Sequence, residues 1–332
     1  MDQCNNKKPE STQLAMEGGI EIELLNYGAR LKSIRVPVKN DMLEVLLGYP
    51  DDQDYLRDEA YLGATLGRYA GRIDSGRTTL YGKNIQLQQN DTPTGHCLHG
   101  GAVGFSHHFW LCSEQTQNSV TYEYTSPDGD QGFPGCLRTQ VTYTLSSPTT
   151  LQIDYTATAD TETIINLSNH AYFNLNTHNE SIANHQLMLN SDFYAPLAEN
   201  SLPCGQIQCV EDTVFDFRQA TGLDKRLYTP DPQLLMAGGY DHYFLLNSIP
   251  QTTAFAATLH SPESGLTMKM FTDQPGVQFY SGNWLAAPFT PQTGLCLEFQ
   301  DIPNEPNLSG FPSTTLQPGE TYRRRIVLEF EI

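Results

Sequence analysis

Apolar and polar residues alternate with a period of two in many parts of the chain. The clearest segment spans residues 151–157, where Leu151, Ile153, Tyr155 and Ala157 alternate with Gln152, Asp154 and Thr156. Further alternating segments cover residues 20–24, 120–124, 141–145 and 326–332. Successive side chains of a strand point to opposite faces, so each segment is predicted to be a strand with one face on a core and one in water.

Turn-forming residues separate these segments. Gly82-Lys83 stands between Leu80 and Ile85, which predicts a hairpin. Residues 126–135 contain three Gly and two Pro, which predicts a long loop. Residues 59–72 have room for a short helix at most, because their three glycines disfavour a long one.

Many short strands joined by Gly- and Pro-rich turns are typical of an antiparallel sandwich or barrel. We therefore predict an all-β fold with few or no long helices. No internal repeat, low-complexity tract or linker divides the 332 residues. We predict a single domain over residues 1–332, with residues 1–18 as an irregular N-terminal segment.

The charge balance narrows the possible partners. Lys and Arg number 19 against 38 Asp and Glu, which gives a formal net charge of −19. A surface this acidic repels phosphate backbones and anionic membranes, so neither nucleic acid nor membrane binding is expected. No apolar run approaches the ~18 residues that span a bilayer. The N-terminal residues lack an apolar stretch behind their positive charges, so we expect a cytoplasmic protein.

The cysteines favour reduced thiols over a disulfide framework. There are seven, an odd number, spread over the whole chain without a CxxC motif: Cys4, Cys97, Cys112, Cys136, Cys204, Cys209 and Cys296. His96, His99, His107 and His108 cluster in sequence, but no cysteine pair with zinc-ligand spacing stands nearby. We therefore predict no metal site.

Candidate chemistry is confined to six polar and aromatic segments. Neither a phosphate-binding GxxxxGK[ST] loop nor a GxSxG nucleophile elbow is present. The six segments cover residues 63–73, 96–110, 164–175, 238–246, 275–285 and 294–307. The first two have structural alternatives. Residues 63–73 would then be a Gly-rich connection whose arginines pair with surface carboxylates, and residues 96–110 a tight turn with a solvated histidine.

Two of these segments carry the strongest signals. Residues 164–175 place Asn166, Asn169, His170 and Asn174 among apolar residues. Buried amides and imidazoles must find hydrogen bonds, so this run either stabilises a core through a network or lines a polar pocket. Glu298 and Gln300 share one face of a predicted strand, and Glu298 follows three apolar residues. Such a carboxylate is either a base with a raised pKa or a structural group bound to backbone amides or an arginine.

The order of motifs along the chain resembles the galactose mutarotases, also called aldose 1-epimerases. The motifs are LHGG at 98–101, NxxNHxYFNL at 166–175, GxDH at 239–242, PGVQFYxGN at 275–283 and LExQxxPxxPN at 297–307. The resemblance extends from about Gly28 to the last strand. It implies a large antiparallel β-sandwich that interconverts the α and β anomers of free hexoses such as galactose and glucose, without a cofactor.

The resemblance also implies a role for individual residues. Glu298 matches the general base that removes the proton of the anomeric hydroxyl, and His170 matches the general acid that protonates the ring oxygen. The ring opens, the aldehyde turns about C1–C2, and the ring closes on the other face. The residues matching those that bind the sugar hydroxyls are Arg72, His99, Asp241 and Gln278. Arg68 lies in the same GRxxxR segment as Arg72 and is expected to make no direct contact.

One position departs from the family pattern. The family commonly reads GRxxNR, and Gly71 stands where the Asn would be. The loss of one hydrogen bond to a hydroxyl typically costs ~0.5–1.5 kcal/mol, so we expect Gly71 to change the sugar preference rather than the reaction.

Three alternatives remain beside this interpretation. The first is a non-catalytic sugar-binding or sensor protein, because a fold alone does not fix an activity. The second is a glycoside hydrolase that uses Asp241 and Glu298 as its carboxylate pair. The third is a hexose 6-phosphate mutarotase, which would need a basic pocket. The expected partner is a small-molecule aldose, while the preferred sugar and the choice between monomer and dimer stay open.

Overall fold

The computed structural model describes residues 7–92, 94–178, 180–247 and 251–331. Its largest sheet has nine strands in the order β10-β11-β12-β13-β27-β23-β22-β17-β20. These strands are β10 (Leu111–Gln115), β11 (Ser119–Ser126), β12 (Leu137–Ser147), β13 (Thr150–Ala159), β17 (Gln186–Leu189), β20 (Thr221–Gly222), β22 (Ala254–His260), β23 (Thr267–Thr272) and β27 (Tyr322–Glu331).

A second sheet has six strands in the order β16-β25-β24-β21-β18-β19. They are β16 (Tyr172–Phe173), β18 (Phe193–Ala195), β19 (Gln208–Cys209), β21 (Asp241–Leu245), β24 (Gly276–Tyr280) and β25 (Leu295–Gln300). A four-stranded sheet is formed by β1 (Ser11–Ala15), β2 (Glu21–Leu25), β3 (Arg30–Val38) and β4 (Asp41–Glu44).

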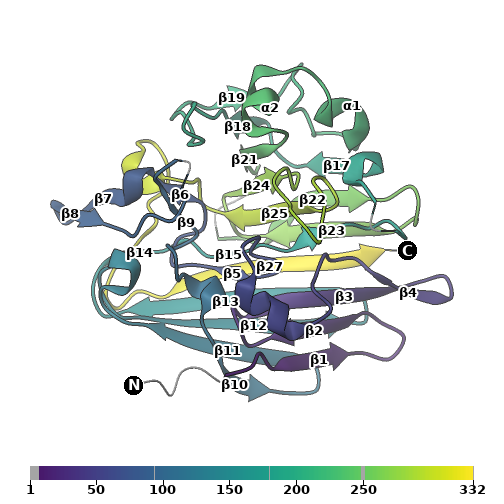
Figure 1. Ribbon diagram of the computed structural model, residues 1–332, viewed down its shortest axis with the longest axis horizontal. Coiled ribbons are helices and arrows are strands. Elements are labelled where there is room, and N and C mark those ends of the chain that lie inside the picture. The colour runs from purple at the N-terminus through teal and green to yellow at the C-terminus, as the bar shows by residue number, and fades with distance from the viewer. Residues whose placement is uncertain (1–6, 93, 179, 248–250, 332) are drawn as a thin grey trace.

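The remaining strands form four short two-stranded sheets. They are β5 (Thr65–Leu66) with β15 (Ser168–Asn169), β6 (Arg72–Ile73) with β9 (Cys97–Leu98), β7 (Arg77–Leu80) with β8 (Lys83–Gln86), and β14 (Thr163–Ile164) with β26 (Thr315–Leu316). In Figure 1, β21, β24 and β25 lie between the helices α1 and α2 above and the long strands β12, β13 and β27 below.

The helices of the described chain are short. They are α1 (Leu223–Leu227), α2 (Pro232–Ala237) and the 3₁₀ segments η1 (Asp52–Arg57), η2 (Asp74–Gly76), η3 (Phe105–His107), η4 (Asp130–Gly132), η5 (Ile182–Asn184) and η6 (Glu305–Asn307). No helix in this part of the chain is long and apolar enough to cross a membrane.

The apolar faces of the large sheets meet in one core. Ile153 and Tyr155 of β13 belong to the same buried cluster as Phe279 of β24 and Leu297 and Phe299 of β25. The named strands pair antiparallel, for example Gln278 opposite Glu298. The predicted all-β antiparallel sandwich is confirmed, as are the strands predicted from alternation. Ile332, the last residue of the final alternating segment, lies outside the described residues.

Three local predictions need correction. Residues 59–72 contain no helix, because Gly63 and Gly71 both have positive φ, which breaks helical repetition. The hairpin between Leu80 and Lys83 exists, but its turn residues are Tyr81-Gly82 instead of Gly82-Lys83. The N-terminal segment is not irregular throughout, since Ser11–Ala15 pairs with β2, while residues 1–6 lie outside the described residues.

The six described cysteines are free, as predicted. Cys97 and Cys296 are buried. Cys4 lies outside the described residues.

Candidate active site

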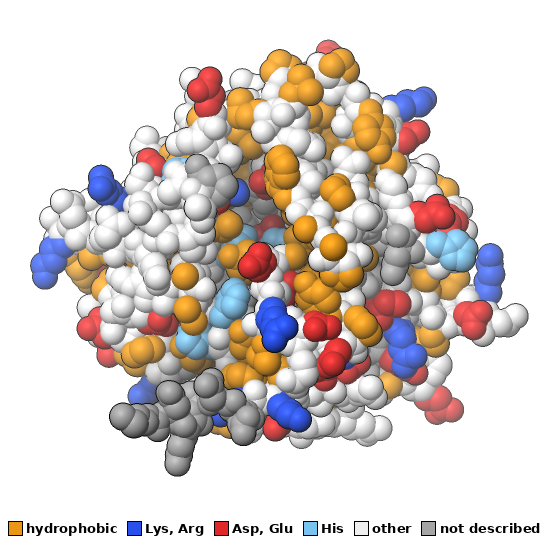
Figure 2. Space-filling model, in the orientation of Figure 1, with side chains coloured by type: hydrophobic (Ala, Val, Ile, Leu, Met, Phe, Trp, Pro, Cys, Tyr) orange, Lys and Arg blue, Asp and Glu red, His pale blue; other side chains and the backbone are white. Residues whose placement is uncertain are grey.

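All six residues selected from the sequence line a single cavity of about 420 Å³: Arg72, His99, His170, Asp241, Gln278 and Glu298. Aromatic side chains line it as well, among them Tyr61, Tyr172, Tyr280 and the exposed Trp284. Figure 2 shows histidine side chains at the bottom of a hollow near the centre of one face, with hydrophobic side chains around it.

One wall of the cavity is the six-stranded sheet. Glu298 on β25 pairs directly with Gln278 on β24, and Asp241 begins the neighbouring strand β21. Strand alternation turns Leu295, Leu297 and Phe299 into the core and leaves Cys296, Glu298 and Gln300 on the opposite face. Phe299 therefore acts as a core residue behind the site.

The opposite wall consists of short strands and turns. Arg72 begins β6, and His99 follows β9, its partner strand. The backbone amide of His99 donates to the Gly71 carbonyl at 3.1 Å, and the Gly71 amide donates to His99 Nδ1 at 3.1 Å. This reciprocal pair fixes the ring of His99, and in its neutral form places the proton on Nε2.

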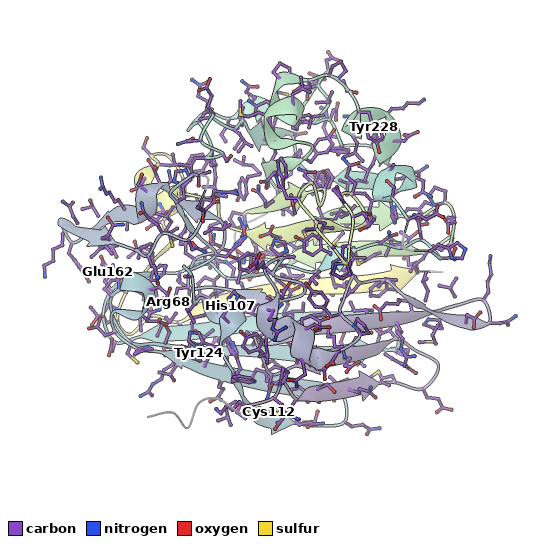
Figure 3. All side chains as sticks on the ribbon, viewed as in Figure 1. Arg68, His107, Cys112, Tyr124, Glu162 and Tyr228 are labelled. Atoms are coloured by element: carbon purple, nitrogen blue, oxygen red, sulfur yellow. The ribbon has the colours of Figure 1, made fainter. Side chains whose placement is uncertain are left out.

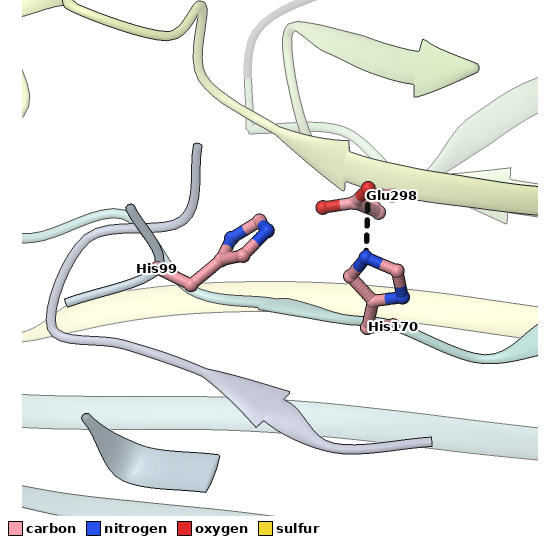
Figure 4. Close-up of side chains that lie close together, drawn as sticks. All are labelled: His99, His170 and Glu298. Atoms are coloured by element: carbon pink, nitrogen blue, oxygen red, sulfur yellow. Dashed lines mark ion pairs between the residues drawn. The ribbon is translucent and has the colours of Figure 1, made fainter. Parts of the chain in front are cut away.

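His170 and Glu298 lie next to each other in the cavity. His170 Nε2 lies 3.6 Å from Glu298 Oε1, as the dashed line in Figure 4 shows. The other ring nitrogen, Nδ1, is 3.4 Å from the sulfur of Cys296. Because Cys296 and Glu298 are two residues apart on β25, one strand contacts both nitrogens of the imidazole.

His99 completes a compact cluster with this pair. The rings of His99 and His170 are perpendicular, with centroids 5.4 Å apart. His99, His170 and Glu298 each have one atom of a kind that binds metal ions, and these three atoms lie within 4.8 Å of one another. The four histidines close together in sequence, His96, His99, His107 and His108, did not indicate this arrangement. Of them only His99 belongs to it, and its two partners, His170 and Glu298, are distant in the chain.

Burial shifts the pKa values of this cluster toward uncharged forms. It raises the pKa of Glu298 well above its ordinary value, and the nearby Asp241 adds to the increase while Arg72 opposes it. Burial lowers the pKa of His170 to about 4. The pKa of His99 is lowered for the same reason, with further contributions from His170 and Arg72. These shifts favour neutral Glu298 and neutral His170.

A polar network orients the remaining groups. Arg72 Nε donates to Asp91 Oδ2 at 2.8 Å, and Arg72 Nη1 lies 3.6 Å from Asp241 Oδ2. Gln278 Nε2 donates to the other Asp241 oxygen at 2.7 Å. Asp91 also accepts from Thr94 at 2.7 Å. The positive charge of Arg72 is therefore shared between two carboxylates, and Asp241 is fixed on both oxygens.

The comparisons with known proteins agree with each other. The family model described as aldose 1-epimerase matches residues 10–329. The chain belongs to the aldose 1-epimerase family. It is 36% identical to the aldose 1-epimerase of Escherichia coli K12, over 93% of this chain and 91% of the relative. It is 34% identical to the galactose mutarotase of Homo sapiens, over 94% and 92%.

Solved structures of the aldose 1-epimerase family share the fold. An aldose epimerase homologue from C. elegans superposes with a TM-score of 0.90 at 29% identity, covering 97% of this chain and 99% of that one. A galactose 1-epimerase from Lactobacillus acidophilus gives 0.87 at 28% identity, covering 100% and 97%.

Several polar residues in the aldose 1-epimerase motifs are structural. Arg68, labelled in Figure 3, is buried and donates to Ser126 and to the carbonyls of Pro127 and Pro134, away from the cavity as expected. The amide nitrogens of Asn166, Asn169 and Asn174 donate to backbone carbonyls. Both interpretations of residues 164–175 therefore apply. His170 lines the cavity, and the three asparagines form a hydrogen-bond network with the backbone.

Two further motif features have structural uses. His242, next to Asp241, accepts from the Asp241 amide at Nδ1 and contacts Gln233 at Nε2. A Cβ at Gly100 would lie 1.9 Å from the Gly67 carbonyl oxygen, so this glycine permits close packing of two backbone segments.

Sequence reasoning missed two residues of this site. The ring of Tyr61 packs against His99 and His170, with centroids 4.8 and 5.8 Å away. Asp91 holds Arg72 from a loop nineteen positions further along the chain. Neither residue stands out by composition or spacing, because both contacts arise only when the turns of the second wall come together.

Proposed function

We propose that this member of the aldose 1-epimerase family interconverts the α and β anomers of free hexoses with Glu298 as the base and His170 as the acid. The observation that carries the proposal is the Nε2–Oε1 distance of 3.6 Å between these buried groups inside a cavity of hexose-compatible size. Ring opening requires removal of a proton from one oxygen and delivery of a proton to another. Two adjacent titratable groups provide both steps.

In the proposed mechanism, Glu298 accepts the proton of the anomeric hydroxyl and His170 donates a proton to the ring oxygen. The C1–O5 bond breaks, and the aldehyde rotates about C1–C2. For closure, His170 takes the proton back from the C5 hydroxyl as its oxygen attacks C1, and Glu298 returns its proton to the carbonyl oxygen. The pair holds one proton throughout, so no net proton is gained or lost.

The electrostatics of the cavity support this exchange. Burial favours neutral Glu298 and neutral His170, which is the protonation state that accompanies the open sugar. The closed sugar is bound with Glu298 ionised and His170 protonated. Arg72 favours the ionised carboxylate, so it reduces the energy difference that burial and Asp241 create between the two states.

The other predicted contacts suit a neutral polyol. Arg72, His99, Asp241 and Gln278 present donors and acceptors to the cavity, and we propose that they bind the sugar hydroxyls. Beside Glu298 and the histidines, the charged side chains lining the cavity are Arg57, Glu59, Arg72 and Asp241. Glu59 and Asp241 balance the two arginines, so the cavity lacks the excess of basic groups that a hexose 6-phosphate would need.

Polarimetry on freshly dissolved α-D-galactose and α-D-glucose tests the proposal. Wild type should accelerate the change in rotation, and Glu298→Gln should lose ~10²–10⁴-fold in kcat, because an amide does not accept the proton. The sugar should still bind to the variant.

Near-wild-type turnover by Glu298→Gln would rule out Glu298 as the base. Sugar binding without acceleration by the wild type would instead identify a non-catalytic binder. Release of nitrophenol from aryl glycosides would support the glycoside hydrolase.

A further inference from the structure

Three neighbouring side chains of the cavity wall have polar atoms without a hydrogen-bond partner among the described residues. These atoms are Gln278 Oε1, Glu298 Oε2, and both Nε2 and Oε1 of Gln300. Gln278 and Glu298 already have proposed roles. Gln300 has none, although it lines the cavity and none of its surface is exposed.

A buried amide with no partner is unusual. Buried side-chain amides nearly always form hydrogen bonds, because an unpaired one has lost its hydration without replacement. Gln274 illustrates the ordinary case: it is equally buried, its Nε2 donates to the Leu167 carbonyl at 3.0 Å, and its Oε1 accepts from Arg324 at 2.9 Å. The two unpaired atoms of Gln300 therefore need an explanation.

The position of Gln300 is fixed by its backbone. It pairs with Gly276 in the β24–β25 ladder, and the hydroxyl of Tyr243 donates to its carbonyl at 3.1 Å. Its side chain emerges on the same face as Glu298, two residues earlier. Two residues along a strand span ~7 Å, so Gln300 faces the cavity about one pyranose ring away from Glu298.

Gly71 lies directly over this amide. A Cβ at Gly71 would be 3.3 Å from Gln300 Nε2 and 3.0 Å from Pro303 Cγ. A side chain at position 71, such as the Asn common in the family, would thus press on Gln300 or pair with it. With glycine there, no side chain of residue 71 competes for the amide.

We propose that the Gln300 amide binds a hydroxyl of the sugar on the part of the ring remote from C1. The proposal deepens the proposed function and rests on it. The amide offers a donor and an acceptor, which matches a hydroxyl, since a hydroxyl can accept and donate. Gln300 is accordingly a substrate-binding residue that takes no part in proton transfer.

The experiment compares Gln300→Leu with Gln274→Leu, the same substitution at two fully buried glutamines. Gln300→Leu should raise KM for α-D-galactose about 3- to 10-fold, as for one neutral hydrogen bond, with kcat within about twofold of wild type. Its Tm should be equal to or above that of wild type, because an unpaired buried amide is replaced by an apolar group of similar shape. Gln274→Leu should lower Tm and leave KM unchanged.

A structural role for Gln300 would give the opposite pattern. If Gln300→Leu lowers Tm as Gln274→Leu does and leaves KM unchanged, the amide stabilises the fold and the proposal is overturned. Sugar analogues sharpen the test: the KM penalty should persist with 2-deoxy-D-glucose and disappear with either 3-deoxy- or 4-deoxy-D-glucose. If the KM penalty persists with both 3-deoxy- and 4-deoxy-D-glucose, the contact lies elsewhere and the proposal is overturned.

A binding measurement tests the Gln300 proposal independently of the proposed catalytic function. The increase in Tm caused by added galactose requires no turnover. This increase should be larger for wild type than for Gln300→Leu, even if wild type failed to accelerate mutarotation. Equal increases for the two proteins would overturn the Gln300 proposal whatever the activity.

Discussion

Strands β13 and β25 have similar alternating sequences but different surroundings. In β13, the apolar residues Ile153 and Tyr155 are buried, while Gln152, Asp154 and Thr156 on the other face are partly exposed. In β25, all six residues are buried, although Glu298 and Gln300 alternate with apolar residues in the same way. The polar face of β13 contacts water, and the polar face of β25 forms the wall of a cavity.

This difference explains why chemistry is concentrated on one of the two strands. On β13, Asp154 pairs with Arg325 at 2.6 Å on the surface, where solvent screens the charge. On β25, Glu298 is 3% exposed, and burial raises its pKa. A polar side chain becomes reactive here because the surrounding walls exclude water, which its position in a strand does not reveal.

The largest expected effect is a loss of kcat, and it comes from comparing two buried histidines, His170 and His185. His185, just before β17 of the nine-stranded sheet, has both ring nitrogens bonded, to the Leu175 amide and the Ile182 carbonyl. Burial lowers its pKa to about 4, as for His170. His170→Asn should reduce kcat for α-D-galactose ~10²–10⁴-fold with the fold intact, because the acid is lost.

The matched variant His185→Asn should lower Tm and leave kcat per folded molecule unchanged. Circular dichroism melts and polarimetry on both variants provide the measurement. If His170→Asn merely unfolds while His185→Asn is tolerated, His170 is a core histidine and the proposed acid is wrong.

An intermediate effect is expected on the pH dependence of the free energy of unfolding, through the raised pKa of Glu298. Because the pKa of Glu298 is raised in the folded protein, the folded state binds a proton that the unfolded state lacks between pH ~4.3 and that raised pKa. The contribution of Glu298 to wild-type stability should therefore fall as pH rises through this window. Glu298→Gln does not titrate, so its stability relative to wild type should increase by about 1.4 kcal/mol per pH unit there and then level off.

Urea denaturation of both proteins from about pH 5 to pH 8 measures this difference. A constant difference across the range would mean that Glu298 titrates alike in the folded and unfolded states. The comparison between a buried and an exposed polar face would then fail.

The smallest effect is expected on β13. Asp154→Asn removes the charge from an exposed ion pair with Arg325, and such pairs contribute ~0–1 kcal/mol to stability. Stability should change by no more than that, the change should shrink in high salt, and kcat should be unaffected. A loss of activity in this variant would show that the polar face of β13 is coupled to the cavity.

Much of the fold could be predicted from the alternation of residues. The strands around Ile22, Tyr122, Tyr143, Ile153 and Leu328 were recognisable because each has one face in a core and one toward water. The short helix for which residues 59–72 have room does not form, since the backbone there depends on positive φ at glycines and on pairing of Thr65–Leu66 with distant residues.

The site could be predicted only in part. Three apolar residues before Glu298 indicated a buried carboxylate, and the motifs indicated the other five residues. The motifs did not reveal which asparagines of residues 164–175 bond to the backbone or that Asp91 orients Arg72. Nor did they reveal that the Gln300 amide has no hydrogen-bond partner among the described residues. These properties depend on contacts between segments far apart in the chain.

By itself, the sequence determined the strands with clear alternation, which face of each of them is apolar, and the family to which the chain is similar. Those features follow from local periodicity and from the order of motifs. Only the tertiary structure decided that the polar face of β25 is buried, that His170 lies against Glu298, and that Gly71 lies over Gln300. Burial and proximity depend on how the sheets and turns enclose a space, and this enclosure sets the pKa values and hydrogen bonds available for chemistry.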